Sequence, residues 1–174
     1  RQRIPDERCE VAVRNGVAVQ LARLLDEGHQ CVISSELHAV RVGRERVHFE
    51  APAAALLNHE MRAFFRWFNA ADGMDLVLKA GVAHLWFVTI HPFDDGNGRI
   101  ARAVADLMLA RSEASAERFY SMSAQIQQER NDYYAILEAT QRGDLDLTDW
   151  LDWFLGCLGR AFDGAETILA SVLA

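Results

Sequence analysis

Hydrophobic residues along much of this chain recur every three or four positions, which is the spacing of one face of an α-helix. The pattern is clearest in residues 53–69, where Leu57, Met61, Phe64 and Phe68 fall on one face. Comparable patterns predict further helices over residues 11–26, 99–111, 123–140 and 148–173, the last of them capped by Thr148.

Residues 76–90 differ from the other segments, because hydrophobic side chains lie almost all round the predicted helix. A helix of this kind is normally buried in the middle of its domain. Pro92 and Gly96 prevent the helix from continuing. We therefore expect a central helix that leads directly into a loop.

A short alternating segment, residues 39–50, is typical of a β-hairpin with its turn at Gly43 and Arg44. Pro52 closes this hairpin and begins the next helix. Five or six helices and one hairpin, without internal repeats, predict an all-α fold with a small β-hairpin.

Composition narrows the class of protein. The chain has 174 residues, of which 51% are hydrophobic and 25% are charged, as expected for one soluble domain with a core. A net charge of −7 argues against nucleic-acid binding through phosphate neutralisation. No hydrophobic run is long enough to span a membrane, and three scattered cysteines without a CxxC pair are typical of a cytoplasmic protein. Because the first residue is Arg, we expect the chain to be an excerpt of a longer protein.

The candidate chemistry lies in residues 91–102, which read His-Pro-Phe-Asp-Asp-Gly-Asn-Gly-Arg-Ile-Ala-Arg. Gly96 and Gly98 permit a tight turn into a helix, whose free backbone N–H groups attract anions. Arg99 and Arg102 share one face of that helix, and the guanidinium group suits phosphate oxygens.

A base and two carboxylates complete this set of residues. His91 can accept a proton near neutral pH. Asp94 or Asp95 can bind Mg²⁺, which prefers a carboxylate together with phosphate oxygens and water. The stretch therefore predicts a site for a polyphosphate and a hard cation beside a general base.

Each of these residues also has an ordinary structural interpretation. The glycines could serve only the turn, His91 could only stabilise the end of a helix, and Arg102 could form an ion pair with Asp106. His84 lies two helical turns before His91 on the same face of the helix. It either hydrogen-bonds a residue of the site without contacting the ligand, or it is a core histidine. We favour the chemical interpretation because the features coincide within one short stretch.

The stretch resembles the signature of the Fic (filamentation induced by cAMP) family, His-x-Phe-x-Asp/Glu-Gly-Asn-Gly-Arg-x-x-Arg. The matching residues are His91, Phe93, Asp95, Gly96, Asn97, Gly98, Arg99 and Arg102. The resemblance extends from about residue 40 to residue 160. We therefore expect a Fic domain over residues 39–174, built as a helical bundle with the hairpin as a flap, after a segment 1–38 of no assigned function.

The resemblance implies transfer of AMP from ATP to a Ser, Thr or Tyr hydroxyl of a protein target. His91 would be the general base, and Asp95 would bind Mg²⁺. Phe93 would be a core anchor. The ATP phosphates would be held by Gly96, Asn97, Gly98 and Arg99, with Arg102 facing the γ-phosphate.

The resemblance also implies binding residues outside the signature. In the flap, Arg46, Val47, His48 and Phe49 would lie beside the nucleotide, and the flap would hold a target segment as an added strand. Tyr133 and Tyr134 match positions that line the nucleotide pocket, although they could instead be a core-and-surface pair on a helix. Gln141 stands where some relatives carry Asn.

Departures from the family pattern define the alternatives. Gly98 replaces the lysine of the kinase-like Doc branch, which favours AMP transfer over phosphorylation. The inhibitory motif of many Fic proteins, Ser/Thr-x-x-x-Glu-Gly/Asn, has no match here. The alternatives are another phosphate-containing donor, AMP removal, or a silent nucleotide-binding module, against which the intact His91 argues. We expect a protein target and neither nucleic acid nor membrane as a partner, and a homodimer remains open.

Overall fold

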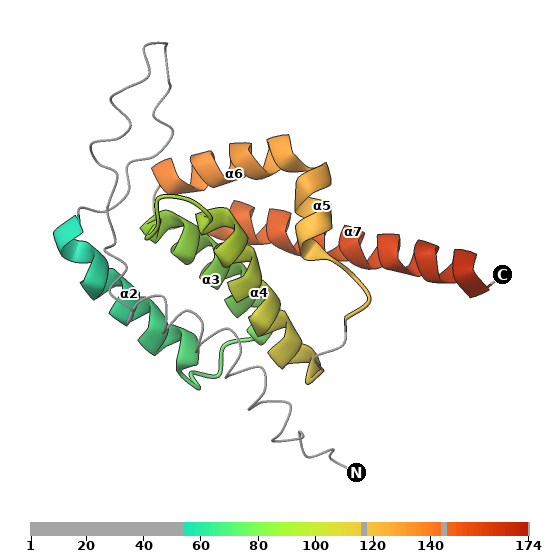
Figure 1. Ribbon diagram of the computed structural model, residues 1–174, viewed down its shortest axis with the longest axis horizontal. Coiled ribbons are helices and arrows are strands. Elements are labelled where there is room, and N and C mark those ends of the chain that lie inside the picture. The colour runs from blue at the N-terminus through green and yellow to red at the C-terminus, as the bar shows by residue number, and fades with distance from the viewer. Residues whose placement is uncertain (1–53, 116–117, 144–145, 174) are drawn as a thin grey trace.

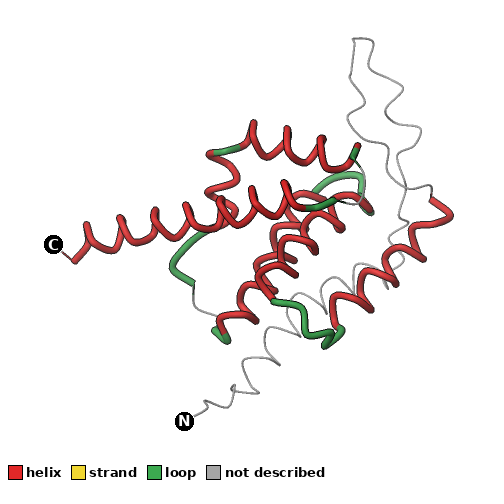
Figure 2. Tube along the Cα trace, turned by 180° about the vertical axis from the view of Figure 1, so that it is seen from behind, coloured by secondary structure: helices red, strands yellow, loops and turns green. Residues whose placement is uncertain are grey.

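The computed structural model describes residues 54–115, 118–143 and 146–173, which are drawn in colour in Figure 1. These residues form a helical bundle, shown from behind in Figure 2, and no strand occurs among them. The all-α prediction is confirmed, whereas the predicted helix 11–26 and hairpin 39–50 lie outside the described residues. The helices are α2 (Ala54–Asn69), α3 (Leu76–Ile90), α4 (Asn97–Glu113), α5 (Met122–Gln128), α6 (Arg130–Arg142) and α7 (Thr148–Leu173).

Helix α3 lies in the middle of the bundle, as the sequence predicts. It packs along α4 and contacts α2 and α7 (Figure 1). The carboxylate of Asp75 caps its first turn by accepting hydrogen bonds from the N–H groups of Val77 and Leu78. At Gly81 an added Cβ would lie 3.0–3.1 Å from side-chain atoms of Leu151 and Phe154, so this glycine lets α7 approach α3 closely.

Two groups of aromatic residues fill the core around α3. On one side, Phe64 of α2 meets Trp86 and Phe87 of α3 in edge-to-face contacts with ring centroids 5.6 and 5.7 Å apart. On the other side, the fully buried Trp150 of α7 donates a hydrogen bond of 2.9 Å from its indole nitrogen to the carbonyl oxygen of Gly81. These contacts fix α2 and α7 on either side of the central helix.

The indole hydrogen bond of Trp150 gives a stability prediction. We expect Trp150→Phe to lower the free energy of unfolding by about 1–2 kcal/mol, because a buried hydrogen bond and some packing are lost. Trp153→Phe is the matched control, since the buried indole nitrogen of Trp153 has no hydrogen-bond partner within the described structure. Urea unfolding of both variants measures the difference, and equal losses would contradict the role given to this bond.

The single helix predicted over residues 123–140 is wrong, because the structure has two helices that meet at a steep angle (Figure 1). The hydrophobic positions Met122, Ile126, Tyr133 and Leu137 keep a helical spacing throughout, so the pattern does not reveal the break. At Glu129 the backbone leaves helical values, with φ −98° and ψ 27°. Its carboxylate accepts two hydrogen bonds of 2.6 Å from Arg160 of α7, which holds the bend in place.

Helix α7 runs under α5 and α6 and then extends beyond the rest of the bundle (Figure 1). None of the described helices combines the length and the hydrophobicity needed to cross a membrane. The loop of residues 91–96 joins α3 to α4 near the C-terminal end of α6 (Figure 1). The predicted signature therefore lies where three helices end or begin.

Candidate functional site

His91 ends helix α3 in a left-handed conformation. Its φ of 51° and ψ of 55° are uncommon for a residue other than glycine, although histidine tolerates them better than most. The His91 N–H donates to the carbonyl oxygen of Phe87 at 3.1 Å and so closes the last turn of the helix. The chain then turns sharply, and the exposed imidazole lies at the start of the loop.

The imidazole of His91 is held through one of its two nitrogens. Nδ1 lies 3.3 Å from the carbonyl oxygen of Val88. A carbonyl oxygen only accepts hydrogen bonds, so Nδ1 carries the proton and Nε2 keeps its lone pair. Nε2 has no partner among the described residues. The structural interpretation of His91 and its role as a base are therefore compatible.

The side chain of Asn97 stabilises the loop through hydrogen bonds to its backbone. Its side chain is only 3% exposed, its Oδ1 accepts from the N–H of Phe93 at 3.0 Å, and its Nδ2 donates to the carbonyl oxygen of Phe93. Both polar atoms of the Asn97 side chain are thus bonded to the backbone of Phe93. If this residue contacts a phosphate, as the resemblance implies, its backbone N–H rather than its side chain does so.

The N-terminus of α4 offers free hydrogen-bond donors. The helix has no side-chain cap, and its first hydrogen bond runs from the N–H of Ile100 to the carbonyl oxygen of Gly96. Within the described structure, the N–H groups of residues 97–99 have no partner. An added Cβ at Gly98 would meet only Nη1 of Arg102, at 3.6 Å, so an anion can approach closely. These features match a helix N-terminus that binds anions.

Asp95 and Arg99 form an exposed ion pair beside these donors. Oδ2 of Asp95 lies 3.0 Å from Nη2 of Arg99, and the two side chains are 91% and 72% exposed. Surface pairs of this kind contribute little to stability, so both groups can exchange partners readily. Oδ1 of Asp95 accepts a hydrogen bond from the N–H of Gly96 at 2.6 Å, which orients the carboxylate next to the start of α4.

Arg102 lies half-buried behind the loop and does not pair with Asp106. Asp106 instead receives hydrogen bonds from Arg118, at 2.9 Å to its carboxylate and 2.6 Å to its carbonyl oxygen. Among the described residues, no hydrogen bond or ion pair of the Arg102 guanidinium occurs. Within the described structure Arg102 thus forms no ion pair with Asp106, although its positive charge partly offsets the rise in the pKa of Asp106 that burial causes.

His84 is a core histidine bonded to Tyr133. Both side chains are buried, and Nε2 of His84 lies 3.1 Å from the hydroxyl oxygen of Tyr133. Burial first, and the nearby charge of Arg102 second, lower the pKa of His84 to about 3, so its ring is neutral. Burial raises the pKa of Tyr133 to about 12 despite the same guanidinium. The two residues form an uncharged pair between α3 and α6.

This buried histidine predicts a pH dependence of stability. In the unfolded chain His84 takes up a proton below about pH 6.5, whereas in the fold it stays neutral down to about pH 3. The unfolded state therefore binds more protons in this window, and stability falls as the pH drops through it. We expect urea unfolding between pH 7.5 and 5 to show a smaller loss for His84→Gln than for the parent. The exposed His59→Gln should follow the parent, and a His84→Gln curve parallel to the parent's would contradict this account.

The remaining predicted residues lie on α6 or outside the described structure. Gln141 donates from Nε2 to the hydroxyl oxygen of Thr89 at 3.0 Å, which ties the end of α6 to the last turn of α3. Tyr133 is only 4% exposed, whereas Tyr134 is exposed with Arg130 over its ring at 5.5 Å. Their predicted contact with a nucleotide stays a prediction. The four predicted flap residues, Arg46, Val47, His48 and Phe49, lie outside the described residues.

Three features of the site are missing from the sequence-based prediction: the bond from His91 to the Val88 carbonyl, the contribution of Thr89, and the internal bonds of Asn97. Of these three features, only the bonds of Asn97 could have been anticipated from the sequence, because a polar residue between two glycines is suited to stabilising a tight turn. The other two depend on how α3 ends and on where α6 lies.

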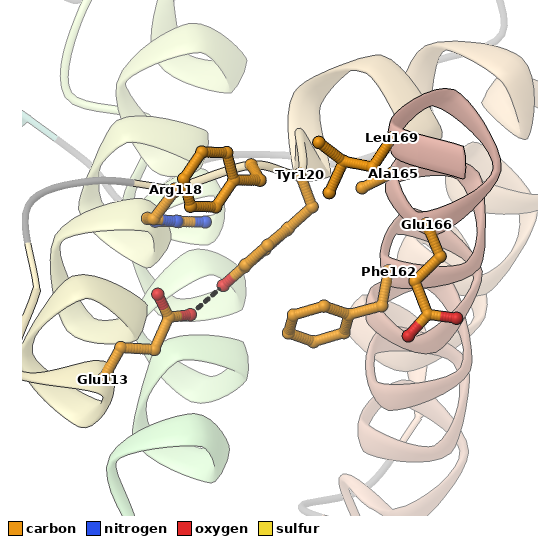
Figure 3. Close-up of a pocket in the computed structure, with 8 residues that line it drawn as sticks. Glu113, Arg118, Tyr120, Phe162, Ala165, Glu166 and Leu169 are labelled. Atoms are coloured by element: carbon orange, nitrogen blue, oxygen red, sulfur yellow. Dashed lines mark hydrogen bonds between the residues drawn. The ribbon is translucent and has the colours of Figure 1, made fainter. Parts of the chain in front are cut away.

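A cavity of about 200 Å³ lies at the other end of α4, roughly 25 Å along that helix from the loop (Figure 3). Hydrophobic side chains of α7, Phe162 and Leu169, line one side of it. On the other side, the hydroxyl of Tyr120 donates to the carboxylate of Glu113. This cavity contains none of the signature residues and is separate from the candidate site.

Several proteins similar to this chain are named protein adenylyltransferase Fic. The one from Drosophila yakuba is 37% identical over 87 residues, covering 49% of this chain and 16% of the relative. The one from Nematostella vectensis is 35% identical over 116 residues, covering 64% of this chain and 25% of the relative. Protein adenylyltransferase fic-1 from Caenorhabditis briggsae is 37% identical over 81 residues, covering 45% of this chain and 15% of the relative. The chain thus spans a quarter or less of the length of these relatives.

The family comparison covers the signature and the helices that hold it. The model of the Fic/DOC family matches residues 19–109, just over half of the chain. The match begins inside the segment 1–38, to which the resemblance assigned no function, and the domain boundary at residue 39 stays a prediction. With the His91 loop, the uncapped α4 N-terminus and the matching arginines in one place, this chain belongs to the Fic/DOC family.

Proposed function

We propose that this chain is the catalytic part of a protein adenylyltransferase, which moves AMP from ATP to a hydroxyl side chain of a target protein. The observation that carries the proposal is the state of His91: its Nδ1 is bonded to the Val88 carbonyl, its Nε2 has no partner within the described structure, and the loop that it begins leads to the uncapped N-terminus of α4. The names of the relatives support the reaction. Because the chain spans a quarter or less of their length, the activity of the whole protein belongs to this proposal.

The reaction needs one proton acceptor and one leaving group. The target hydroxyl gives its proton to Nε2 of His91 as its oxygen bonds to the α-phosphorus of ATP. The bond from that phosphorus to the oxygen bridging to the β-phosphate breaks, and pyrophosphate leaves. General-base help of this kind contributes about 10²–10⁴-fold in rate, and positioning of the phosphates supplies much of the rest.

The phosphates would be held by the beginning of α4. The N–H groups of residues 97–99, which have no partner within the described structure, and the helix dipole would stabilise negative charge there. Arg99 turns from Asp95 to a phosphate oxygen, which its exposed position permits. Arg102 would face the γ-phosphate, and its guanidinium, which has no ion-pair partner within the described structure, would present planar, charged donors for that contact.

Asp95 fits a role in holding Mg²⁺. Mg²⁺ usually takes one or two protein carboxylates and fills its other positions with phosphate oxygens and water. Within the described structure no cluster of three or more potential metal ligands occurs, so an ion at Asp95 would need phosphate oxygens and water for its other positions. The bound ion would neutralise part of the phosphate charge that develops as pyrophosphate leaves.

The covalent product tests the proposal. Proteins of the source cells, incubated with the chain, Mg²⁺ and ATP, are digested and analysed by tandem mass spectrometry. The proposal predicts peptides that carry an adenosine monophosphate group on a Ser, Thr or Tyr hydroxyl and that are missing when His91→Asn replaces the parent. Peptides that instead gain a lone phosphate would assign the site to phosphorylation.

A further inference from the structure

The last turns of helix α7 carry hydrophobic side chains that no other part of the described structure covers. The helix has buried residues as far as Ala161, whereas none of residues 162–173 is buried. Single exposed hydrophobic residues are common on proteins, but a group of them on one short stretch of helix is typical of an interaction surface. Five large ones are exposed here, by between 43% and 84%: Phe162, Ile168, Leu169, Val172 and Leu173.

These side chains continue the face by which α7 packs in the bundle. Leu158 belongs to the core, and the hydrophobic positions after it follow in alternating steps of four and three residues, at Phe162, Ala165, Leu169 and Val172. Such spacing forms one stripe along a helix, and a second helix packs against a stripe of this kind. Residues 162–173 extend over roughly 17 Å, which is enough for about three turns of a partner helix.

The stripe forms one wall of the cavity at the far end of α4 (Figure 3). Phe162, Ala165 and Leu169 line this cavity from α7, and Phe119 and Tyr120 line it from the segment after α4. The rings of Tyr120 and Phe162 pack together with centroids 4.2 Å apart, which joins the two walls. The cavity is therefore a hydrophobic groove that can accept side chains of a segment lying along α7.

The charges beside this groove are mainly negative. Glu113 and Glu166 line it on opposite sides (Figure 3). Arg118 also lines it, but its guanidinium is bound to the carboxylate of Asp106 at 2.9 Å. The sequence of α7 has no Lys or Arg after Arg160. An occupant that carries Lys or Arg beside its hydrophobic residues therefore complements the groove.

This distribution of charge decides between the possible occupants. A second copy of the chain would bring the same two acids of α7, Asp163 and Glu166, against the groove, and each copy has a net charge of −7. A helix that lies on an anionic membrane normally carries Lys and Arg on its polar face, which this part of α7 does not. A basic amphipathic helix of another protein meets neither objection.

We propose that the groove between residues 162–172 of α7 and the segment 118–120 binds an amphipathic helix of a partner protein. The hydrophobic side chains of this helix enter the groove, and its Lys or Arg residues face Glu113 and Glu166. The groove lies at the opposite end of α4 from the His91 loop, so this binding needs neither ATP nor AMP transfer. It is a contact with a second protein in addition to the proposed reaction.

Two designed peptides test this proposal. Each is a helix-forming peptide of about 18 residues, with Leu at alternating steps of three and four. One peptide carries Lys and the other carries Glu beside the leucines, and both bear a fluorophore. Fluorescence anisotropy with the full chain, without nucleotide, measures the two dissociation constants. We expect the Lys peptide to bind at least about tenfold more tightly than the Glu peptide.

Substitutions in the groove separate this binding from a general attraction of a cationic peptide to an acidic chain. Leu169→Glu should weaken binding of the Lys peptide about tenfold or more, although it adds a negative charge, because it places a carboxylate in the hydrophobic stripe. Leu56→Glu is the matched control, since it makes the same change at an exposed leucine of α2, and it should bind like the parent.

Reversing one charge tests the predicted basic partner. Glu166→Lys should reduce the preference for the Lys peptide about two- to fivefold. Asp152→Lys reverses an exposed acid elsewhere on α7 and should change this preference much less. Because Leu169 lies on the surface, Leu169→Glu should unfold at the parent's urea concentration, and Val172→Glu repeats the test at a more exposed position of the stripe.

Several outcomes would overturn the proposal. They are the absence of binding of either peptide to the parent, equal binding of the two peptides, and unchanged binding by Leu169→Glu. Sedimentation equilibrium that finds a dimer of the parent but a monomer of Leu169→Glu would assign the groove to a second copy instead. Flotation of the parent with anionic phospholipid vesicles, lost in Leu169→Glu, would assign it to a membrane.

Discussion

Replacing His91 is expected to lower the rate of AMP transfer by about 10²–10⁴-fold while ATP binding stays close to that of the parent. In the proposed function, Nε2 accepts a proton only from the attacking hydroxyl, whereas the start of α4 would hold the phosphates. Initial rates of incorporation from α-labelled ATP, together with a calorimetric titration of ATP, measure the two effects separately.

The left-handed backbone of His91 decides which variants to compare. Alanine is disfavoured at φ 51°, so His91→Ala also strains the end of α3. Asparagine tolerates this conformation, so His91→Asn removes the base and spares the backbone. Both variants should lose transfer, and only His91→Ala should lose measurable stability. Transfer by His91→Asn at the parent's rate would contradict the role of the base.

Replacing Asn97 should impair the site, because both polar atoms of its side chain hold the loop through the backbone of Phe93. Asn97→Ala removes both hydrogen bonds to Phe93 and leaves those backbone groups without their partner. We expect the free energy of unfolding to fall by about 2 kcal/mol. Transfer should fall at least about tenfold, because the N–H groups of residues 97–99 lose their fixed direction.

Asn69→Ala is the matched control for this change. The Asn69 side chain also donates to a backbone carbonyl, that of Phe65 at 2.8 Å, but it lies exposed at the end of α2. This variant should lose well under 1 kcal/mol of stability and keep its transfer rate. If Asn97→Ala resembles Asn69→Ala in both respects, the loop does not depend on the Asn97 brace.

Hydrophobic patterning predicted a helix well where no other structure could accommodate the segment. The predicted bounds of α3, residues 76–90, agree with the structure, because its hydrophobic side chains and the following Pro92 leave no alternative. The break at Glu129 was missed, since the hydrophobic spacing continues through it. The bend depends on an ion pair with Arg160, 31 residues further along the chain, and no local pattern contains that information.

The signature predicted which residues gather at the site but not how each is held. His91, Asp95, Arg99 and Arg102 lie together around one loop, as a contiguous motif requires. The sequence could not predict that Arg118 rather than Arg102 pairs with Asp106, because that choice depends on the path of the chain after α4. The bond between His84 and Tyr133 likewise joins residues 49 positions apart.

The origin of the transferred phosphorus tests the central claim most directly. The chain is incubated with source-cell proteins, Mg²⁺ and ATP labelled at either the α- or the γ-phosphate, with His91→Asn in parallel. The account predicts protein-bound label from the α-position only, and only with His91 present. Label from the γ-position would make the reaction a phosphorylation. Equal α-label with the parent and with His91→Asn would contradict the assignment of this site as the one that transfers AMP.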